Sequence, residues 1–125
     1  MVKELRYFSL SEFRCKCNQC KGYPAGGMSN TLLLKLDELR EKLGYPIYVS
    51  SGYRCEYWNQ RNGGVDNSTH TLGQAADIYS DYATTEKLLE LAEKVGFDGI
   101  GYYPNEGFIH VDCRCDGRKP NYYRW

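Results

Sequence analysis

The sequence has no surplus of either charge and no long apolar run. Sixteen lysine and arginine residues balance sixteen aspartate and glutamate residues in a chain of 125. This balance gives no electrostatic reason to expect binding to nucleic acid or to an anionic membrane. No stretch approaches the roughly 20 consecutive apolar residues that span a membrane. No apolar segment follows the charged first six residues, so we expect no signal peptide and synthesis in the cytoplasm.

Histidine is scarce, with only two copies, and each is followed by an aspartate. Asp77 comes seven residues after His70, and Asp112 comes two residues after His110. Two imidazoles and one carboxylate are a recognised ligand set for catalytic zinc, which leaves a fourth position open to water. A structural zinc site is usually closed by four ligands, often thiolates. A short His–Asp spacing also arises by chance. The two histidines and the aspartate nevertheless match the ligand set of catalytic zinc, so His70, Asp77 and His110 are the candidate zinc ligands.

Local patterns predict one small α+β domain over residues 1–125, with an antiparallel sheet backed by helices. Apolar residues at spacings of three and four indicate a helix over 30–43: Leu32, Leu36, Leu39 and Leu43. A second helix over 85–95 is expected to face the sheet with Leu88, Leu89, Ala92 and Val95. The other expected elements are a short helix from Ser9, strands over 47–50 and 75–79, a short helix around 56–62, and a hairpin of 99–103 and 108–112.

Further short segments accompany the histidines: Ser51-Gly52-Tyr53-Arg54, Asn59, Gly63-Gly64, the stretch from Ser68 to Asp77, and His110-Val111-Asp112. Together they resemble the D-alanyl-D-alanine carboxypeptidase family of zinc peptidases, whose pattern reads S-G-Y-R, N, G-G, S-x-H-x-x-G-x-A-x-D and H-V-D. The closest likeness is to the small single-domain branch that includes phage endolysins. The resemblance runs from about Phe8 to the end of the chain.

The resemblance implies a hedgehog/DD-peptidase-like fold and one catalytic Zn²⁺. It also implies hydrolysis of peptide bonds involving D-amino acids in bacterial peptidoglycan, by a D,D-carboxypeptidase or an endopeptidase. The expected partners are stem or crossbridge peptides, and we expect a monomer. An enzyme of this kind without a signal peptide would reach the wall after holin-type release, or would be a domain excised from a longer exported protein.

The resemblance also suggests roles for residues around the metal. Arg54 occupies the position of a substrate-contacting arginine, where its guanidinium can grip a carboxylate or stabilise an oxyanion. The alternative for Arg54 is a structural ion pair that holds its loop. Ser68, Tyr102 and Tyr103 are the other candidate substrate-binding residues, although the tyrosines fit a core position equally well.

The acid–base carboxylate has two candidates here, because the family position for it does not hold a carboxylate in this chain. Several branches of the family carry this residue three positions before the last histidine. That position is Gly107 here. Asp112 should share the face of His110, because side chains two apart on a strand point the same way. Glu106 is the other candidate, on the expected hairpin turn. We favour Asp112 as the catalytic carboxylate, with orientation of His110 as its alternative role.

The missing carboxylate at Gly107 also leaves a different class of function open. Hedgehog signalling domains are similar in fold and keep a zinc site while acting as ligands. A non-catalytic zinc-containing binding module is therefore the alternative to a peptidase.

Six cysteines complete the set of reactive residues: Cys15, Cys17, Cys20, Cys55, Cys113 and Cys115. The first three form a C-x-C-x2-C cluster, which needs one more ligand to close a structural metal site. In an oxidising compartment the same even count would suggest disulfides, and in a reducing one free thiols are also compatible. The sequence leaves a second structural zinc, disulfides and free thiols open.

Overall fold

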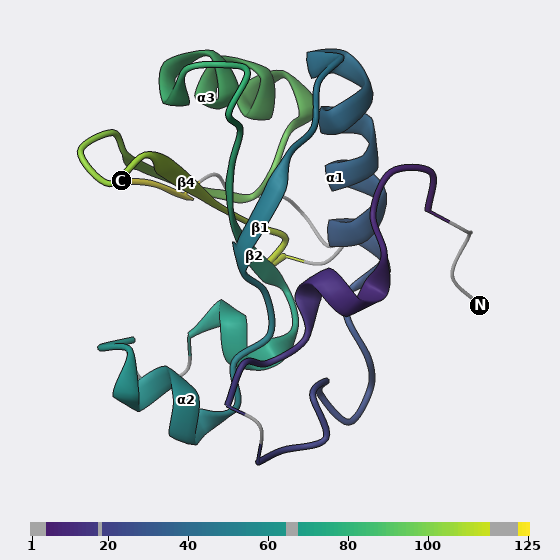
Figure 1. Ribbon diagram of the computed structural model, residues 1–125, viewed down its shortest axis with the longest axis vertical. Coiled ribbons are helices and arrows are strands. Elements are labelled where there is room, and N and C mark those ends of the chain that lie inside the picture. The colour runs from purple at the N-terminus through teal and green to yellow at the C-terminus, as the bar shows by residue number, and fades with distance from the viewer. Residues whose placement is uncertain (1–4, 18, 65–67, 116–122) are drawn as a thin grey trace.

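The computed structural model describes residues 5–17, 19–64, 68–115 and 123–125, and these form an α+β fold around one five-stranded sheet (Figure 1). The strand order is β1-β2-β4-β3-β5. The elements in chain order are η1 (Leu10–Phe13), α1 (Asn30–Leu43), β1 (Tyr48–Ser51), α2 (Glu56–Arg61), η2 (Thr69–Leu72), β2 (Ala75–Tyr79), α3 (Thr85–Val95), β3 (Gly99–Tyr103), β4 (Phe108–Asp112) and β5 (Tyr123–Arg124). The predicted α+β class is confirmed, and the expected helices and strands lie within a few residues of their predicted bounds.

The predicted antiparallel pairing is present in four of the strands, and a fifth strand makes the sheet mixed. Neighbours among β1, β2, β4 and β3 pair antiparallel, but β5 pairs parallel to β3. Asp112, the last residue of β4, pairs with Gly99 at the start of β3, and Tyr123 at the start of β5 pairs with the same glycine. Strands β3 and β5 therefore start at the same end of the sheet and run in the same direction. Two residues are too short to give a strand pattern in the sequence.

The two long helices begin and end where capping chemistry predicts. The Ser29 hydroxyl accepts a hydrogen bond from the Leu32 amide at the start of α1, and the Thr84 hydroxyl does the same for Lys87 at the start of α3. Gly44 follows α1 in the left-handed conformation that glycine adopts without strain. Single capping residues therefore predict where these two helices begin and where α1 ends.

The buried faces of the helices differ from the predicted stripes by a few residues. In α1, Leu33 is buried together with the expected leucines, and Leu43 is only partly buried. In α3, Leu91 is buried with Leu88 and Ala92, whereas Leu89 and Val95 are only partly buried. Contact between α1 and α3 turns α3 toward its neighbour as well as toward the sheet, which shifts its buried face.

Strand alternation gives the sheet two chemically different faces. One face packs against α1 and α3 in the hydrophobic core through Ala76, Ile78, Ile100, Ile109 and Val111. The intervening residues of β2, β3 and β4 point to the opposite face and include Asp77, Gly99, Gly101, His110 and Asp112. The apolar face fixes the register, so the polar face is fixed with it.

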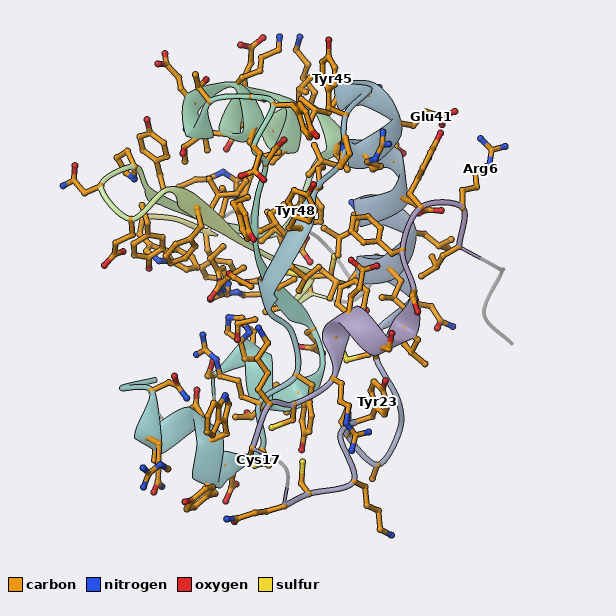
Figure 2. The ribbon with its side chains drawn as sticks, viewed as in Figure 1. Arg6, Cys17, Tyr23, Glu41, Tyr45 and Tyr48 are labelled. Atoms are coloured by element: carbon orange, nitrogen blue, oxygen red, sulfur yellow. The ribbon has the colours of Figure 1, made fainter. Side chains whose placement is uncertain are left out.

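The segment before η1 lies along α1. The Arg6 and Tyr7 amides donate to the Asp37 carboxylate, and the Arg6 guanidinium lies 3.1 Å from Glu41 Oε1 (Figure 2).

Cys17 lies at the other end of the molecule, near α2 (Figure 2). No helix among the described residues has both the length and the apolar character needed to cross a membrane.

Replacing Leu36 by alanine should lower the free energy of unfolding by about 2–5 kcal/mol, because the side chain is fully buried and its loss leaves a cavity. Leu34→Ala on the same helix is the matched control, since Leu34 is 41% exposed and should change stability by no more than about 0.5 kcal/mol. Urea unfolding followed by circular dichroism measures both. Equal losses would contradict the described orientation of α1.

Candidate metal centre and groove

The three candidate zinc ligands come from η2, β2 and β4 and meet on the polar face of the sheet. Asp77 and His110 lie directly opposite each other in the β2–β4 register. His70 lies in the single turn of η2, where the Ser68 hydroxyl accepts a hydrogen bond from the His70 amide. Gly73 ends this turn in the left-handed conformation and leads the chain into β2. All three ligand residues are buried.

Their donor atoms converge at equal distances. His70 Nε2, Asp77 Oδ1 and His110 Nδ1 are each 3.2 Å from the other two. Ligand atoms about 2.0–2.1 Å from a tetrahedral zinc ion are separated by about 3.3 Å. The three atoms therefore have the spacing of three corners of a zinc coordination tetrahedron.

The outer nitrogen of each imidazole is held by a hydrogen-bond acceptor. His70 Nδ1 lies 2.8 Å from the Gly52 carbonyl oxygen, and His110 Nε2 lies 2.7 Å from Asp112 Oδ2. With a proton on each outer nitrogen, both inner nitrogens present lone pairs toward the Asp77 carboxylate. This arrangement requires a positive charge at its centre, either a proton or a metal ion, and the outer acceptors fix the tautomers that suit a metal.

Electrostatics around the histidines follow from these contacts. Burial alone would lower the pKa of His110, but its hydrogen bonds to Asp112 and Asp77 raise it above the ordinary value. Burial alone would raise the pKa of Asp77, yet hydrogen bonds to His110 and His70 hold it well below the ordinary range. Asp77 is therefore a carboxylate at neutral pH, as a metal ligand must be.

Asp112 shares the face of His110, as predicted, but its carboxylate lies behind the imidazole and not in the open groove. Asp112 is fully buried, and the Arg114 guanidinium donates to both of its oxygens at 3.0 and 2.7 Å. Burial would raise the pKa of Asp112, but hydrogen bonds from His110 and Arg114 lower it to about 2. Gly99 makes room for this carboxylate, since a Cβ there would lie 2.6 Å from Asp112 Cγ.

Arg54 supports the third ligand from the other side. Its Nη2 lies 3.1 Å from Asp77 Oδ2, the oxygen that does not face the histidines. Its Nε donates to Ser51 Oγ at 2.9 Å and its Nη1 to Asn59 Oδ1 at 3.4 Å. The ion pair expected as the alternative for Arg54 is thus present, while the same side chain also lines the groove beside the ligands.

A groove of about 730 Å³ opens above the three ligands. It is lined by Arg54, Asn62, Gly63, Gly64, Ser68, Thr69, His70, Asp77, Tyr103, Glu106, Phe108, His110, Arg114 and Trp125. Ser68 and Tyr103 were both predicted to bind substrate, and Glu106 was the alternative catalytic carboxylate. Tyr102 and Asp112 do not line the groove, because alternation turns Tyr102 to the other face and Asp112 is covered.

Trp125 is a groove residue that the sequence analysis did not identify. Its indole lies 5.1 Å from the His110 ring, and its Nε1 donates to Tyr103 Oη at 2.7 Å. Gly101 leaves the space for it, since a Cβ there would lie 2.6 Å from that nitrogen. The alternating glycines of Gly99-Ile100-Gly101 were the available signal, because they leave one face of β3 without side chains.

Comparison with known proteins identifies relatives of this chain. The sequence profile of a family described as Peptidase M15 matches residues 6–112. The peptidoglycan L,D-endopeptidase MepK of Escherichia coli (strain K12) is 32% identical over 72 residues, which are 54% of this chain and 40% of that protein. The zinc D-Ala-D-Ala carboxypeptidase of Streptomyces albus G is 32% identical over 114 residues, or 81% of this chain and 44% of that protein. The chain thus spans less than half the length of these two relatives.

Replacing Gly99 by alanine should lower the free energy of unfolding by about 1–3 kcal/mol, because the added methyl group overlaps the buried Asp112 carboxylate. Gly26→Ala is the matched control, since an added Cβ there contacts nothing within 4 Å. Thermal and urea unfolding of the two variants measure the difference. A Gly99→Ala protein as stable as Gly26→Ala would show that Asp112 is not packed against β3.

Proposed function

This chain belongs to the peptidase M15 family, and on that premise we propose that it is a zinc-dependent hydrolase of peptide bonds in bacterial peptidoglycan. One observation carries the proposal: His70 Nε2, Asp77 Oδ1 and His110 Nδ1 lie 3.2 Å from one another at the floor of a groove. Three protein ligands leave the fourth zinc position for water or substrate, as hydrolysis requires.

The donor set fits zinc for chemical reasons. Imidazole and carboxylate ligands in a 2:1 ratio are typical of catalytic zinc, and each imidazole has an outer acceptor that fixes its orientation. When bound, zinc supplies Lewis acidity, which polarises a carbonyl group and lowers the pKa of water to about 7. Proton transfer and substrate binding in the groove are carried out by the side chains of this chain.

We revise the choice of acid–base residue in favour of Glu106. Asp112 is fully buried and bonded to both His110 and Arg114, so its carboxylate is occupied in holding the ring. Glu106 lines the groove from the β3–β4 turn, which supports its assignment as the carboxylate that faces the substrate. In this assignment Glu106 accepts the proton of the attacking water and returns it to the leaving amine.

Arg54 and the aromatic side chains bind the substrate. The Arg54 guanidinium has five N–H donors, and among the described residues three of them are directed at Ser51, Asn59 and Asp77; we assign the other two to a substrate oxygen. Tyr103 and Trp125 form one wall of the groove, where their faces suit contact with a peptide or sugar.

The bond that is cut is proposed from the relatives. One is named as an L,D-endopeptidase and another as a D-Ala-D-Ala carboxypeptidase, so both names specify a bond to a D-amino acid. We therefore propose a stem or crossbridge bond that involves a D-residue. Digestion of purified peptidoglycan followed by mass spectrometry separates the two activities, since a carboxypeptidase releases free D-alanine and an endopeptidase cuts stems or crossbridges into smaller peptide fragments.

The setting follows from the proposed substrate. We place the action of the chain at the cell wall, either as a phage endolysin released through a holin or as a domain of a longer exported protein. A monomer is sufficient for this activity, because all three ligands and the groove come from one chain.

Replacing His110 by alanine should lower the bound zinc by one equivalent per chain, because two ligands hold zinc far more weakly than three. Zinc is measured by plasma mass spectrometry after gel filtration. Asp81→Ala, which removes an exposed carboxylate, is the control and should keep the wild-type zinc content. Equal zinc in the wild type and His110→Ala would remove these three residues as the ligands.

Replacing Glu106 by glutamine should lower kcat on purified peptidoglycan by about 10²–10⁴-fold while zinc stays bound, as expected for loss of a general acid–base group. Asp112→Asn should instead weaken zinc binding by about 10–100-fold, the usual effect of losing the partner of a histidine ligand. Glu90→Gln, at an exposed position of α3, controls for loss of charge.

The reverse result would restore the assignment made from the sequence. It requires that Asp112→Asn abolish turnover with zinc retained and that Glu106→Gln remain active. A zinc-loaded wild-type protein that binds peptidoglycan without cutting it would instead support the non-catalytic binding module.

A further inference from the structure

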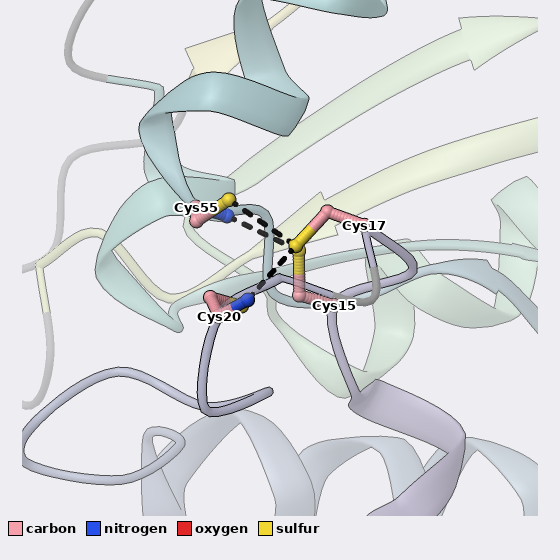
Figure 3. A group of neighbouring side chains, drawn as sticks. All are labelled: Cys15, Cys17, Cys20 and Cys55. Carbon is pink, nitrogen blue, oxygen red and sulfur yellow. Dashed lines mark hydrogen bonds between the residues drawn. The ribbon is translucent and has the colours of Figure 1, made fainter.

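Four of the six cysteines converge at a point separate from the histidines. Cys15, Cys17 and Cys20 lie in the loop after η1, and Cys55 caps the start of α2 (Figure 3). Their four sulfur atoms all lie within 4.8 Å of one another. Cys113 and Cys115 do not belong to this group. From this geometry we propose that Cys15, Cys17, Cys20 and Cys55 bind a second, structural zinc ion through four thiolates.

The sulfur spacing favours a metal over a disulfide. The Sγ atoms of Cys17 and Cys55 are 3.6 Å apart. A disulfide requires about 2.05 Å. Four sulfurs at about 2.3 Å from a tetrahedral zinc ion are about 3.8 Å apart, which is close to the distance here. A set of four thiolates is also the donor set of closed structural zinc sites, in contrast to the histidine site with its open position.

Backbone amides surround the sulfurs as they would surround thiolates. The amides of Gln19 and Cys20 donate to Cys17 Sγ at 3.3 and 3.4 Å. The Gly22 amide donates to Cys20 Sγ at 3.2 Å, and the Cys55 amide donates to Cys15 Sγ at 3.4 Å. A neutral thiol is a weak acceptor. Four N–H groups directed at three sulfurs would stabilise the thiolate form, which is the form that binds metal.

The cluster joins two segments that lie side by side in the fold. Residues 13–17 and 19–22 lie against residues 52–55, where the Tyr53 amide donates to the Phe13 carbonyl at 2.9 Å. The backbones are so close that a Cβ on Gly52 would lie 2.6 Å from Phe13 Cα. Zinc at the cysteines would fix the spacing of these segments.

The clamped segment is the one that supports the histidine site. The Gly52 carbonyl holds His70, and Arg54 holds Asp77. Cys55 lies one residue after Arg54 and three residues after Gly52. The cysteine-bound zinc is thus a positioning element for His70 and Asp77, which it reaches through these two supporting residues.

Cobalt substitution tests the proposal in the whole protein, because Co²⁺ reports its ligands by colour. Wild-type protein purified with zinc should hold two equivalents, and its cobalt form should show the sulfur-to-cobalt charge-transfer band of a tetrathiolate site. Cys20→Ser should lose that band and one zinc. His110→Ala should keep the band and lose the other zinc. Cys115→Ser, outside the cluster, is the matched control and should keep both metals and the band.

The positioning of the histidine site by the cysteine site is tested by measuring zinc affinity at the histidines. Cys20→Ser should weaken zinc at the histidine site by about 10–100-fold, a loss of the size seen when support behind metal ligands is removed. Should Cys20→Ser fail to fold, the wild-type protein still decides, through its zinc content, its cobalt spectrum and a count of thiols.

The thiol count is made after denaturation in chelator without reductant. Six titratable thiols with two zinc ions per chain support the site. Two titratable thiols would show that the four cysteines form disulfides, and six thiols with one zinc ion and no sulfur-to-cobalt band would show free thiols; either result overturns the proposal. Peptidoglycan cleavage is not used in these measurements, so failure of the proposed activity is separable from failure of the cysteine site.

Discussion

Three buried acceptor atoms held 3.2 Å apart are the constraint on which the rest of this structure depends. Buried polar groups that face one another without a compensating charge are costly, so the fold must both provide a cation at this point and prevent the side chains from turning away. Each ligand is accordingly held from behind by a different residue: Gly52 holds His70, Arg54 holds Asp77, and Asp112 holds His110.

The sheet reconciles this polar centre with a stable core by separating the two on opposite faces. Burial of Ile78, Ile109 and Val111 against the helices stabilises the register, at roughly 1.5–3 kcal/mol for each large apolar side chain. Because alternation is strict, the same register sets Asp77 opposite His110 on the far face. A slip of one residue would expose the core and separate the ligands together.

Most of the fold, and the identity of the candidate ligands, could be predicted from local patterns. Capping residues and apolar periodicity fixed the helices, and two histidines left few choices for a metal. How deeply each side chain is buried could not be predicted from these patterns. Alternation places Asp112 on the face of His110, but only the absence of a side chain at Gly99 lets its carboxylate turn under the ring. In the same way, the choice of Cys55 over Cys113 as neighbour of the first three cysteines depends on the packing of Gly52 against Phe13, contacts between residues 39 apart in sequence.

The backbone conformation of Gly107 has a consequence for which residues can evolve at this position. It lies three residues before His110, adopts a left-handed backbone with φ of 78°, and has open space where a Cβ would point. The obstacle to a side chain there is thus the backbone dihedral and not a clash, and asparagine and aspartate tolerate that dihedral best among residues with a side chain. Glycine and aspartate codons differ by a single nucleotide. The arrangement in which a carboxylate stands three residues before the last histidine, and the arrangement in this chain, are therefore neighbours in sequence space, and a lineage can pass between them without rebuilding the hairpin.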